Sequence, residues 1–346
     1  MENKKGSLLL LSIAAIGLLF GGYFAIEEWF IEPSFATNDA MIWTLPLVSY
    51  IFLALTSTGI SILLTGGELI GNQVIKAHKS ILLITALSLL IGAFASLATE
   101  LGSFLNVFWL LITPNPTSPI WWMGTLYSIE LGLLGIKLFA LLSGRKFSFD
   151  RWLSVGTLVI AVSASLVLGS VFGTAISRVG YYGMDASVLT FTFALASGLC
   201  VAPLLLTSDK RDVLVLPGRI VLALLAMLLV VKAVYLTRSS IPAEMQWLSL
   251  LVPFALAVSA VLYKSSPQLC ALIALPTILY TELAFVIQGQ VQALGPKQTW
   301  FDTTQAYMPN IAEVGVFIFG CSVAYLCFYV LRAFAPSNSE EKEAIA

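Results

Sequence analysis

The sequence is poor in the residues that usually hold metals and redox cofactors. Its 346 residues include a single histidine, His78, so two axial histidines for a b-type haem are excluded within this chain. The four cysteines, at positions 200, 270, 321 and 327, fall inside apolar runs and show no Cys-x-x-Cys spacing. Cysteines in such runs usually pack as small hydrophobic side chains. We therefore expect this chain to hold no haem, metal or flavin.

Charge is scarce as well. Charged residues make up only 11% of the chain, whereas 58% of its residues are hydrophobic. Soluble domains carry about a quarter charged residues, so this chain could not cover a soluble surface. The formal net charge of −1 argues against a nucleic-acid partner. The composition therefore predicts a protein whose solvent is membrane lipid.

Apolar stretches of about 20 residues can cross a bilayer as helices. The first such stretch here follows Lys4 and Lys5, and we interpret it as an uncleaved span because it is longer than a typical signal-peptide core. The pattern predicts an all-α polytopic membrane protein of about ten transmembrane helices. The expected spans are roughly 7–25, 42–66, 80–98, 119–143, 152–177, 187–207, 215–236, 246–263, 267–290 and 309–334.

No linker or low-complexity segment divides the chain, so residues 1–335 are expected to form a single transmembrane domain. Within it we expect residues 42–177 to form a first four-helix bundle and residues 187–290 a second. The spans at 7–25 and 309–334 would then be peripheral helices. The polar tail at 336–346 is expected to be disordered and cytoplasmic.

The orientation follows from the lysines and arginines, which are enriched in cytoplasmic loops. Of the 18 such residues, two (Lys137 and Lys232) lie within spans. Only Arg178, Arg238 and Lys297 lie in the loops that follow odd-numbered spans. The others lie in the N-terminal segment, in the loops that follow even-numbered spans and in the C-terminal segment. Both termini are therefore predicted to be cytoplasmic.

The opposite, outer loops are longer and rich in aromatic residues and proline. They cover residues 27–40, 101–119 and 291–309. Aromatic side chains at this depth commonly anchor helices at the membrane interface, and the stretch "FLNVFWLLI" could form a helix lying along the membrane. The same pattern also suits a docking face for an extracytoplasmic partner.

A few charged residues fall at bilayer depth, where they are costly and are functional hypotheses by default. Glu130 and Glu282 lie near the middle of their spans and must face protein, water or a ligand, so both are candidate proton carriers. Hydrogen bonding between helices is the structural alternative. Lys137 lies seven residues beyond Glu130, too far for a direct bond along one helix. For Glu68 and Glu313, near span ends, we favour carboxylates that reach the interface.

Four stretches occur in an order that resembles the NrfD/PsrC family, the membrane subunits of polysulfide-reductase-like respiratory complexes, in its ten-span variety. They are "TSTGISILLTGGELIG" (56–71), "ATELGSFLNVFWLL" (98–111), "NPTSPIWWMGTLYSIELGLLGIKL" (115–138) and "LGSVFGTAISRVGYYG" (168–183). The resemblance implies a prokaryotic cytoplasmic (inner) membrane and two four-helix bundles. It also implies electron exchange between a quinone near the outer face and a ferredoxin-like iron–sulfur subunit, beside a further catalytic subunit. Some members are thought to couple this exchange to proton translocation.

The resemblance also assigns residues. Glu100 and Tyr127 would hydrogen-bond the quinone head, menaquinone or ubiquinone, and exchange its protons. Trp121, Trp122 and Asn106 would complete the quinone-binding set, and the loop that shapes it would contain Pro116, Ser118 and Pro119. A proton path would use Glu130, Lys137, Glu68 and Glu282.

One departure keeps other interpretations open. Many relatives continue the Leu101-Gly102 turn with His-Pro and an arginine, whereas this chain has Ser103-Phe104-Leu105. A structural membrane anchor without quinone binding is therefore one alternative. A ten-span secondary transporter is the other, although the internal repeats typical of transporters are not visible in the sequence.

Overall fold

The computed structural model of this chain describes residues 2–39, 41–101, 106–145, 148–175, 178, 181, 183–237, 243–291 and 307–335. Within these residues all regular secondary structure is helical and no strand occurs. The predicted all-α fold is therefore confirmed. The tail at 336–346, most of the outer loop at 291–309, and the Gly102–Leu105 stretch lie outside the described residues.

In the described part of the chain, nine helices are long and apolar enough to cross a membrane. A tenth, α10 (Ala243–Ser265), corresponds to the predicted span at 246–263, and its segment Leu251–Ser265 is apolar. The chain is thus a multi-pass membrane protein. The nine helices are α1 (Glu2–Phe30), α2 (Leu45–Leu69), α4 (Lys79–Glu100), α6 (Pro119–Leu142), α7 (Asp150–Gly173), α8 (Asp185–Leu205), α9 (Asp212–Thr237), α11 (Pro267–Gln288) and α12 (Ile311–Phe334).

Several helices begin where the sequence supplies a start signal. Pro46, Pro119 and Pro267 lie in the first turns of α2, α6 and α11, where a missing backbone N–H breaks no helical hydrogen bond. Helix α12 begins with a reciprocal cap. The Asn310 side chain accepts a hydrogen bond from the backbone N–H of Glu313, whose carboxylate accepts one from the backbone N–H of Asn310.

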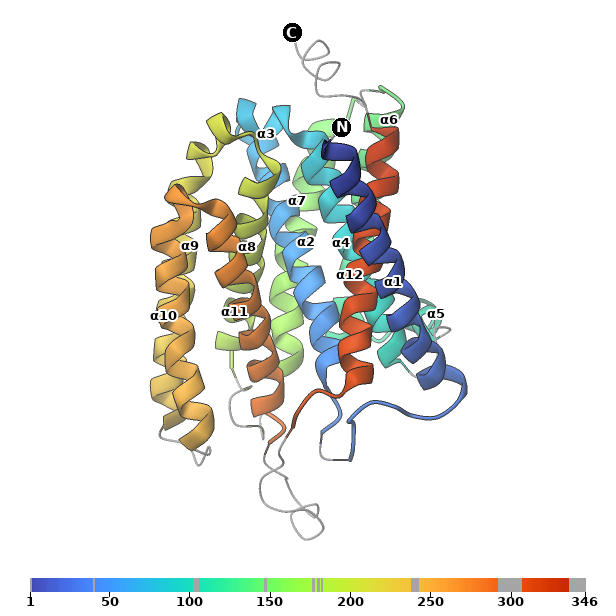
Figure 1. Ribbon diagram of the computed structural model, residues 1–346, viewed down its shortest axis with the longest axis vertical. Coiled ribbons are helices and arrows are strands. Elements are labelled where there is room, and N and C mark those ends of the chain that lie inside the picture. Colours follow the sequence, from blue (N-terminus) through green and yellow to red (C-terminus); the bar gives the residue numbers. More distant parts are fainter. Residues whose placement is uncertain are drawn as a thin grey trace.

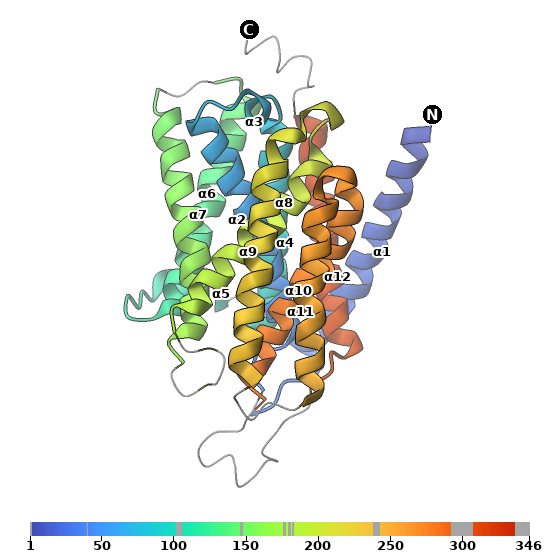
Figure 2. The ribbon, with the colours of Figure 1, turned by 90° about the vertical axis from the view of Figure 1, so that its left-hand side faces the viewer.

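The long helices form two adjoining bundles (Figures 1 and 2). In the first bundle, α2 contacts α4 and α7, and α6 contacts the same two helices from the other side. In the second, α8 contacts α9 and α11, and both of these contact α10. Helices α2 and α8 join the bundles, while α1 and α12 pair with each other and pack on α4 and α2. This is the predicted arrangement of two bundles with peripheral first and last spans.

The junction between the bundles depends on two glycines that face each other. A Cβ atom added to Gly59 of α2 would clash with the backbone of Ala194 in α8. One added to Gly198 of α8 would clash with the backbone of Gly59 and Ile60. The two helices therefore approach as closely as their backbones allow, as small residues permit in membrane proteins.

The start of α1 and the end of α12 lie at the same end of the molecule, as Figure 1 shows. Two short helices, α3 (Gln73–Ala77) and η1 (Ser208–Lys210), lie in connections at this end, which we call the inner end after the predicted orientation. At the outer end, α5 (Asn106–Ile112) lies beside the bundles, with Phe108 and Trp109 exposed. It falls in the stretch for which an interfacial helix was one expectation.

Candidate functional site

A row of buried polar side chains runs along one face of α2 inside the first bundle. Thr58, Ser61, Thr65 and Glu68 follow one another at spacings of three and four residues, which places them on the same helical face. The three hydroxyl-bearing side chains are fully buried. Thr65 donates a hydrogen bond to the Ser61 carbonyl oxygen at 2.7 Å. The first bundle therefore has a polar strip in its interior.

Glu130 of α6 lies against this strip. Its side chain is fully buried, and its Oε2 accepts a hydrogen bond of 3.1 Å from the Thr58 hydroxyl. Its Oε1 has no hydrogen-bond partner among the described residues, with Ser61 nearby. A buried polar atom without a partner in a native protein calls for an explanation such as water or a ligand.

Two tyrosines lie close to Glu130. The Tyr50 ring of α2 and the Tyr127 ring of α6 meet edge to face, with centroids 5.9 Å apart. Both side chains are fully buried, and neither hydroxyl makes a well-formed hydrogen bond among the described residues, although Thr58 lies close to the Tyr127 hydroxyl. Both hydroxyls interact electrostatically with Glu130. We call Tyr50, Thr58, Tyr127 and Glu130 the central cluster.

The spacing of the polar residues in α6 places them on the face of the helix that points into the bundle. Tyr127, Glu130 and Lys137 all lie on the buried face, and Ile129 and Ile136 on the exposed face. The helix therefore presents a polar stripe to the bundle and an apolar stripe to lipid.

Toward the inner end, Lys137 makes an ion pair with Glu68. Its Nζ donates to Glu68 Oε2 and to the Ser154 hydroxyl at 2.8 Å, and Ser154 in turn donates to Glu68 Oε2 at 2.7 Å. Lys79 contacts the other Glu68 oxygen at 2.9 Å. We call Glu68, Lys79, Lys137 and Ser154 the inner ion cluster. It closes the inner end of the polar strip.

The expectation that the Glu68 carboxylate reaches the interface stays a prediction, and the structure shows which side chains surround that carboxylate. The Glu68 side chain is only 10% exposed, and two lysines and a serine surround it. The spacing excluded a direct bond between Lys137 and Glu130, and the partner of Lys137 is Glu68 of α2. Its identity depends on how α2 and α6 are rotated against each other.

The expectation that the Glu313 carboxylate reaches the interface is wrong, because its side chain is fully buried. Its carboxylate accepts hydrogen bonds from the backbone N–H groups of Ala36 and Asn310 and from the Tyr307 hydroxyl at 2.9 Å. Burial and the neighbouring Glu313 carboxylate raise the pKa of the Tyr307 hydroxyl. Glu313 therefore ties the segment before α2 to the start of α12.

Glu282 of α11 is 1% exposed, and neither of its carboxylate oxygens has a partner among the described residues. It interacts electrostatically with Tyr127 across the junction between the bundles. The structure thus places a second unpartnered carboxyl group on the far side of the central cluster.

Glu100 and Tyr127 belong to different groups. Glu100 ends α4 at the outer end, where its electrostatic neighbours are Glu28 and Glu313. Tyr127 has Tyr50 and Glu130 as neighbours and lies eight residues inside α6, about 12 Å below its outer end at 1.5 Å per residue. No described contact joins the two residues that the resemblance assigns to one quinone head.

The two tryptophans of the proline-rich loop differ from each other. Their rings meet edge to face at 4.8 Å. Trp122 is 41% exposed and donates its indole N–H to the Pro116 carbonyl oxygen at 2.8 Å, so it braces the loop. The Trp121 indole nitrogen is buried and has no partner among the described residues. Asn106 is exposed and donates to the Leu101 carbonyl oxygen.

Sequence reasoning missed Tyr50, Thr58, Ser61 and Ser154. The three-and-four spacing of polar residues in α2 was a signal that could have identified its members. It is a weak signal, because serine and threonine commonly satisfy their own helix backbone in membrane spans. In the described part of the chain, no group of three or more His, Cys, Asp or Glu residues could hold a metal ion.

Comparison with known proteins does not assign this chain to a family. No protein-family model matches the sequence, and no curated protein matches it either.

Proposed function

We propose that this protein is the quinone-reactive membrane subunit of a respiratory oxidoreductase complex, similar to members of the NrfD/PsrC family. The observation that carries the proposal is the central cluster. It combines two tyrosine hydroxyls and a carboxyl oxygen that are buried at span depth and lack partners among the described residues. The four sequence stretches that resemble the family support the same conclusion, and one of them contains Tyr127 and Glu130.

The chemistry of quinol oxidation needs groups of this kind. A quinol head releases two hydroxyl protons with its two electrons, so hydrogen-bonding groups able to take up protons must lie beside it. Tyr127 and Tyr50 can donate to or accept from the quinone oxygens, and Glu130 can receive the proton. Trp121 and Glu100 lie nearer the outer end, where the tail and head of a lipid-soluble quinone would enter.

The electrons would pass to a ferredoxin-like iron–sulfur subunit at the outer face, beside a further catalytic subunit. This partner comes from the family resemblance. The aromatic and proline-rich connections at the outer end, with α5 and its exposed Phe108 and Trp109, offer it a surface.

The protons would travel inward along the polar strip. From Glu130 the route follows Thr58, Ser61 and Thr65 to the inner ion cluster. Lys79, whose side chain is 33% exposed, would connect that cluster to the aqueous phase. The distribution of basic residues supports a cytoplasmic inner end, and the resemblance supports a prokaryotic cytoplasmic membrane.

Removing the tyrosine hydroxyls in the assembled complex tests the proposal. We expect Tyr127→Phe and Tyr50→Phe each to lower quinol turnover by about tenfold or more, in line with the loss of a positioned proton-transfer group. Tyr329→Phe, on the exposed face of α12, is the matched control. Normal kcat and KM for quinol in both central variants would reject the central cluster as the site.

Two structural observations weigh against the alternatives. A transporter typically carries discontinuous helices at its substrate site, whereas α2, α4, α6, α7, α8 and α11 each run as one continuous helix. A purely structural anchor gains nothing from unpartnered buried hydroxyl and carboxyl groups, which cost stability.

A further inference from the structure

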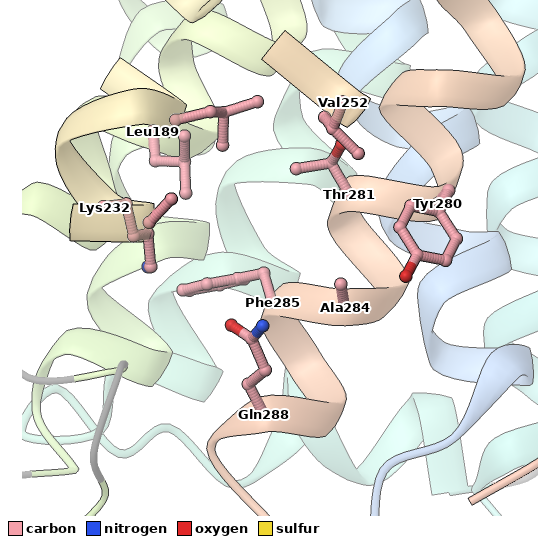
Figure 3. A pocket seen from close by; sticks show the side chains of 10 residues that line it. Leu189, Lys232, Val252, Tyr280, Thr281, Ala284, Phe285 and Gln288 are labelled. Atoms are coloured by element: carbon pink, nitrogen blue, oxygen red, sulfur yellow. The ribbon is translucent and has the colours of Figure 1, made fainter. Parts of the chain in front are cut away.

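The second bundle contains a partly open cavity that the proposed quinone site does not use. Its volume is about 60 Å³, and its lining comes from all four helices of the bundle, α8 to α11. One ordered water occupies roughly 10–15 Å³ on this measure, so the space suits about four to six water molecules. The residues that matter below are Leu189, Lys232, Val252, Thr281, Phe285 and Gln288 (Figure 3).

Lys232 supplies the cavity with a cationic group at membrane depth. It lies five residues before the outer end of α9, about 8 Å along the helix axis. Its Nζ lies 4.3 Å from the centroid of the Phe285 ring, inside the bundle. Figure 3 shows Lys232 next to Phe285, with the Gln288 amide on the other side of the ring. A lysine side chain that extended to place its ammonium group at the membrane surface would run along the lipid-facing side of its helix.

The cavity can hold water because polar groups surround part of it. Lys232 offers N–H donors, Gln288 offers an amide, and Thr281 has a hydroxyl oxygen that can accept a second hydrogen bond. Water in a buried site needs two to four such partners. The remaining walls are apolar side chains such as Leu189 and Val252.

Helix α11 connects this cavity to the first bundle. Thr281 lines the cavity, and the next residue, Glu282, interacts electrostatically with Tyr127 of the central cluster. Glu282 is buried, and both of its oxygens lack partners among the described residues. The two residues follow each other on α11, so Glu282 lies one position from a residue that lines the cavity.

We propose that the cavity is a hydrated outer arm of the proton route, in which Glu282 exchanges protons with water that Lys232 holds. The route would then have two arms that meet at the central cluster. The inner arm runs from Glu130 to the inner ion cluster, and the outer arm runs from Tyr127 to Glu282 and through the cavity to the outer end. Each step moves a proton between neighbouring side chains or water molecules and changes no oxidation state. The inference rests on the proposed function only for the source of the protons.

Hydroxyl-radical labelling tests the hydration of the cavity without quinone turnover. Radicals generated from bound water by X-rays modify side chains beside that water, and mass spectrometry measures the modification. We expect Phe285 to be labelled several-fold more than Phe193, which is fully buried in α8, and more than Phe254, which faces lipid. Lys232→Met should remove most of the Phe285 labelling. Labelling of Phe285 no higher than that of Phe193 in the unaltered protein would overturn the proposal.

Proton translocation by the complex in proteoliposomes tests the role in the route. Lys232→Met and Glu282→Gln should lower the number of protons moved per electron, whereas Lys264→Met, at the exposed inner end of α10, should not. Lys232→Gln keeps a hydrogen-bonding side chain and provides a second variant if the methionine does not assemble. Normal stoichiometry in both cavity variants would overturn the outer arm even with a hydrated cavity. Loss of quinol turnover in the unaltered complex would instead reject the proposed function and leave the labelling result intact.

Discussion

Lys137 of α6 is paired with Glu68 of α2, a residue that lies 69 positions earlier in the chain. The pair links two helices of the first bundle at the inner end of its polar strip, and Ser154 of α7 bonds to both partners. Three of the four helices of this bundle therefore meet at one ion pair. Lys79 at the start of the fourth, α4, completes the set.

Breaking this pair should destabilise the protein. We expect Lys137→Met to lower the free energy of unfolding by up to about 3 kcal/mol, because Glu68 loses its buried cationic partner and keeps only Ser154 and the more exposed Lys79. Thermal unfolding in detergent measures the change. Lys264→Met is the control, since that lysine is exposed and lies 3.9 Å from its acidic partner. Equal melting temperatures for the two variants would show that the buried pair contributes little.

The glycine contact between the bundles gives a second prediction. Gly59→Ala should lower the melting temperature, because its Cβ would meet the backbone of Ala194 and force α2 and α8 apart. Gly66→Ala on the same helix meets nothing within 4 Å and is the matched control. There the change should be neutral or stabilise by up to about 1 kcal/mol, through the higher helix propensity of alanine. The prediction fails if both variants unfold at the same temperature.

The proton route predicts a specific effect of Glu130→Gln. The amide keeps the size of the side chain and can still hydrogen-bond to Thr58, but it cannot carry a proton. We expect either fewer protons moved per electron or slower quinol turnover, measured in proteoliposomes with a pH-sensitive dye. Glu32→Gln, on an exposed segment, serves as the control. Normal rate together with normal stoichiometry would exclude Glu130 from proton transfer.

The Glu313 network predicts a local effect at the outer end. Glu313→Ala removes the acceptor of three hydrogen bonds, from Ala36, Tyr307 and Asn310. We expect a loss of roughly 1–2 kcal/mol from the lost cap and bonds. The segment between α1 and α2 should also be cleaved faster by added protease. Tyr307→Phe removes one bond and should have a smaller effect; cleavage at the unaltered rate in Glu313→Ala would contradict the network.

The sequence by itself determined the helical architecture. The length and hydropathy of each span are properties of one segment in isolation, since every backbone group in lipid must be satisfied within its own helix. Short connections then make neighbouring spans antiparallel, and the spans from 42 to 177 and from 187 to 290 pack as the two expected bundles. Start signals such as Pro119 and Pro267 are equally local.

Only the tertiary structure decided which polar groups meet. The partner of Lys137 depends on the rotation of α2 against α6, and the burial of Glu313 depends on a segment that precedes α2. The resemblance assigns Glu100 and Tyr127 to one quinone head, but the two residues lie at different depths. Glu100 ends α4 at the outer end, whereas Tyr127 lies eight residues inside α6, which begins at that end. The space beside Lys232 exists because four helices leave it unfilled. Contacts of this kind are set by the relative rotation, depth and spacing of helices, and a hydropathy pattern contains none of these quantities.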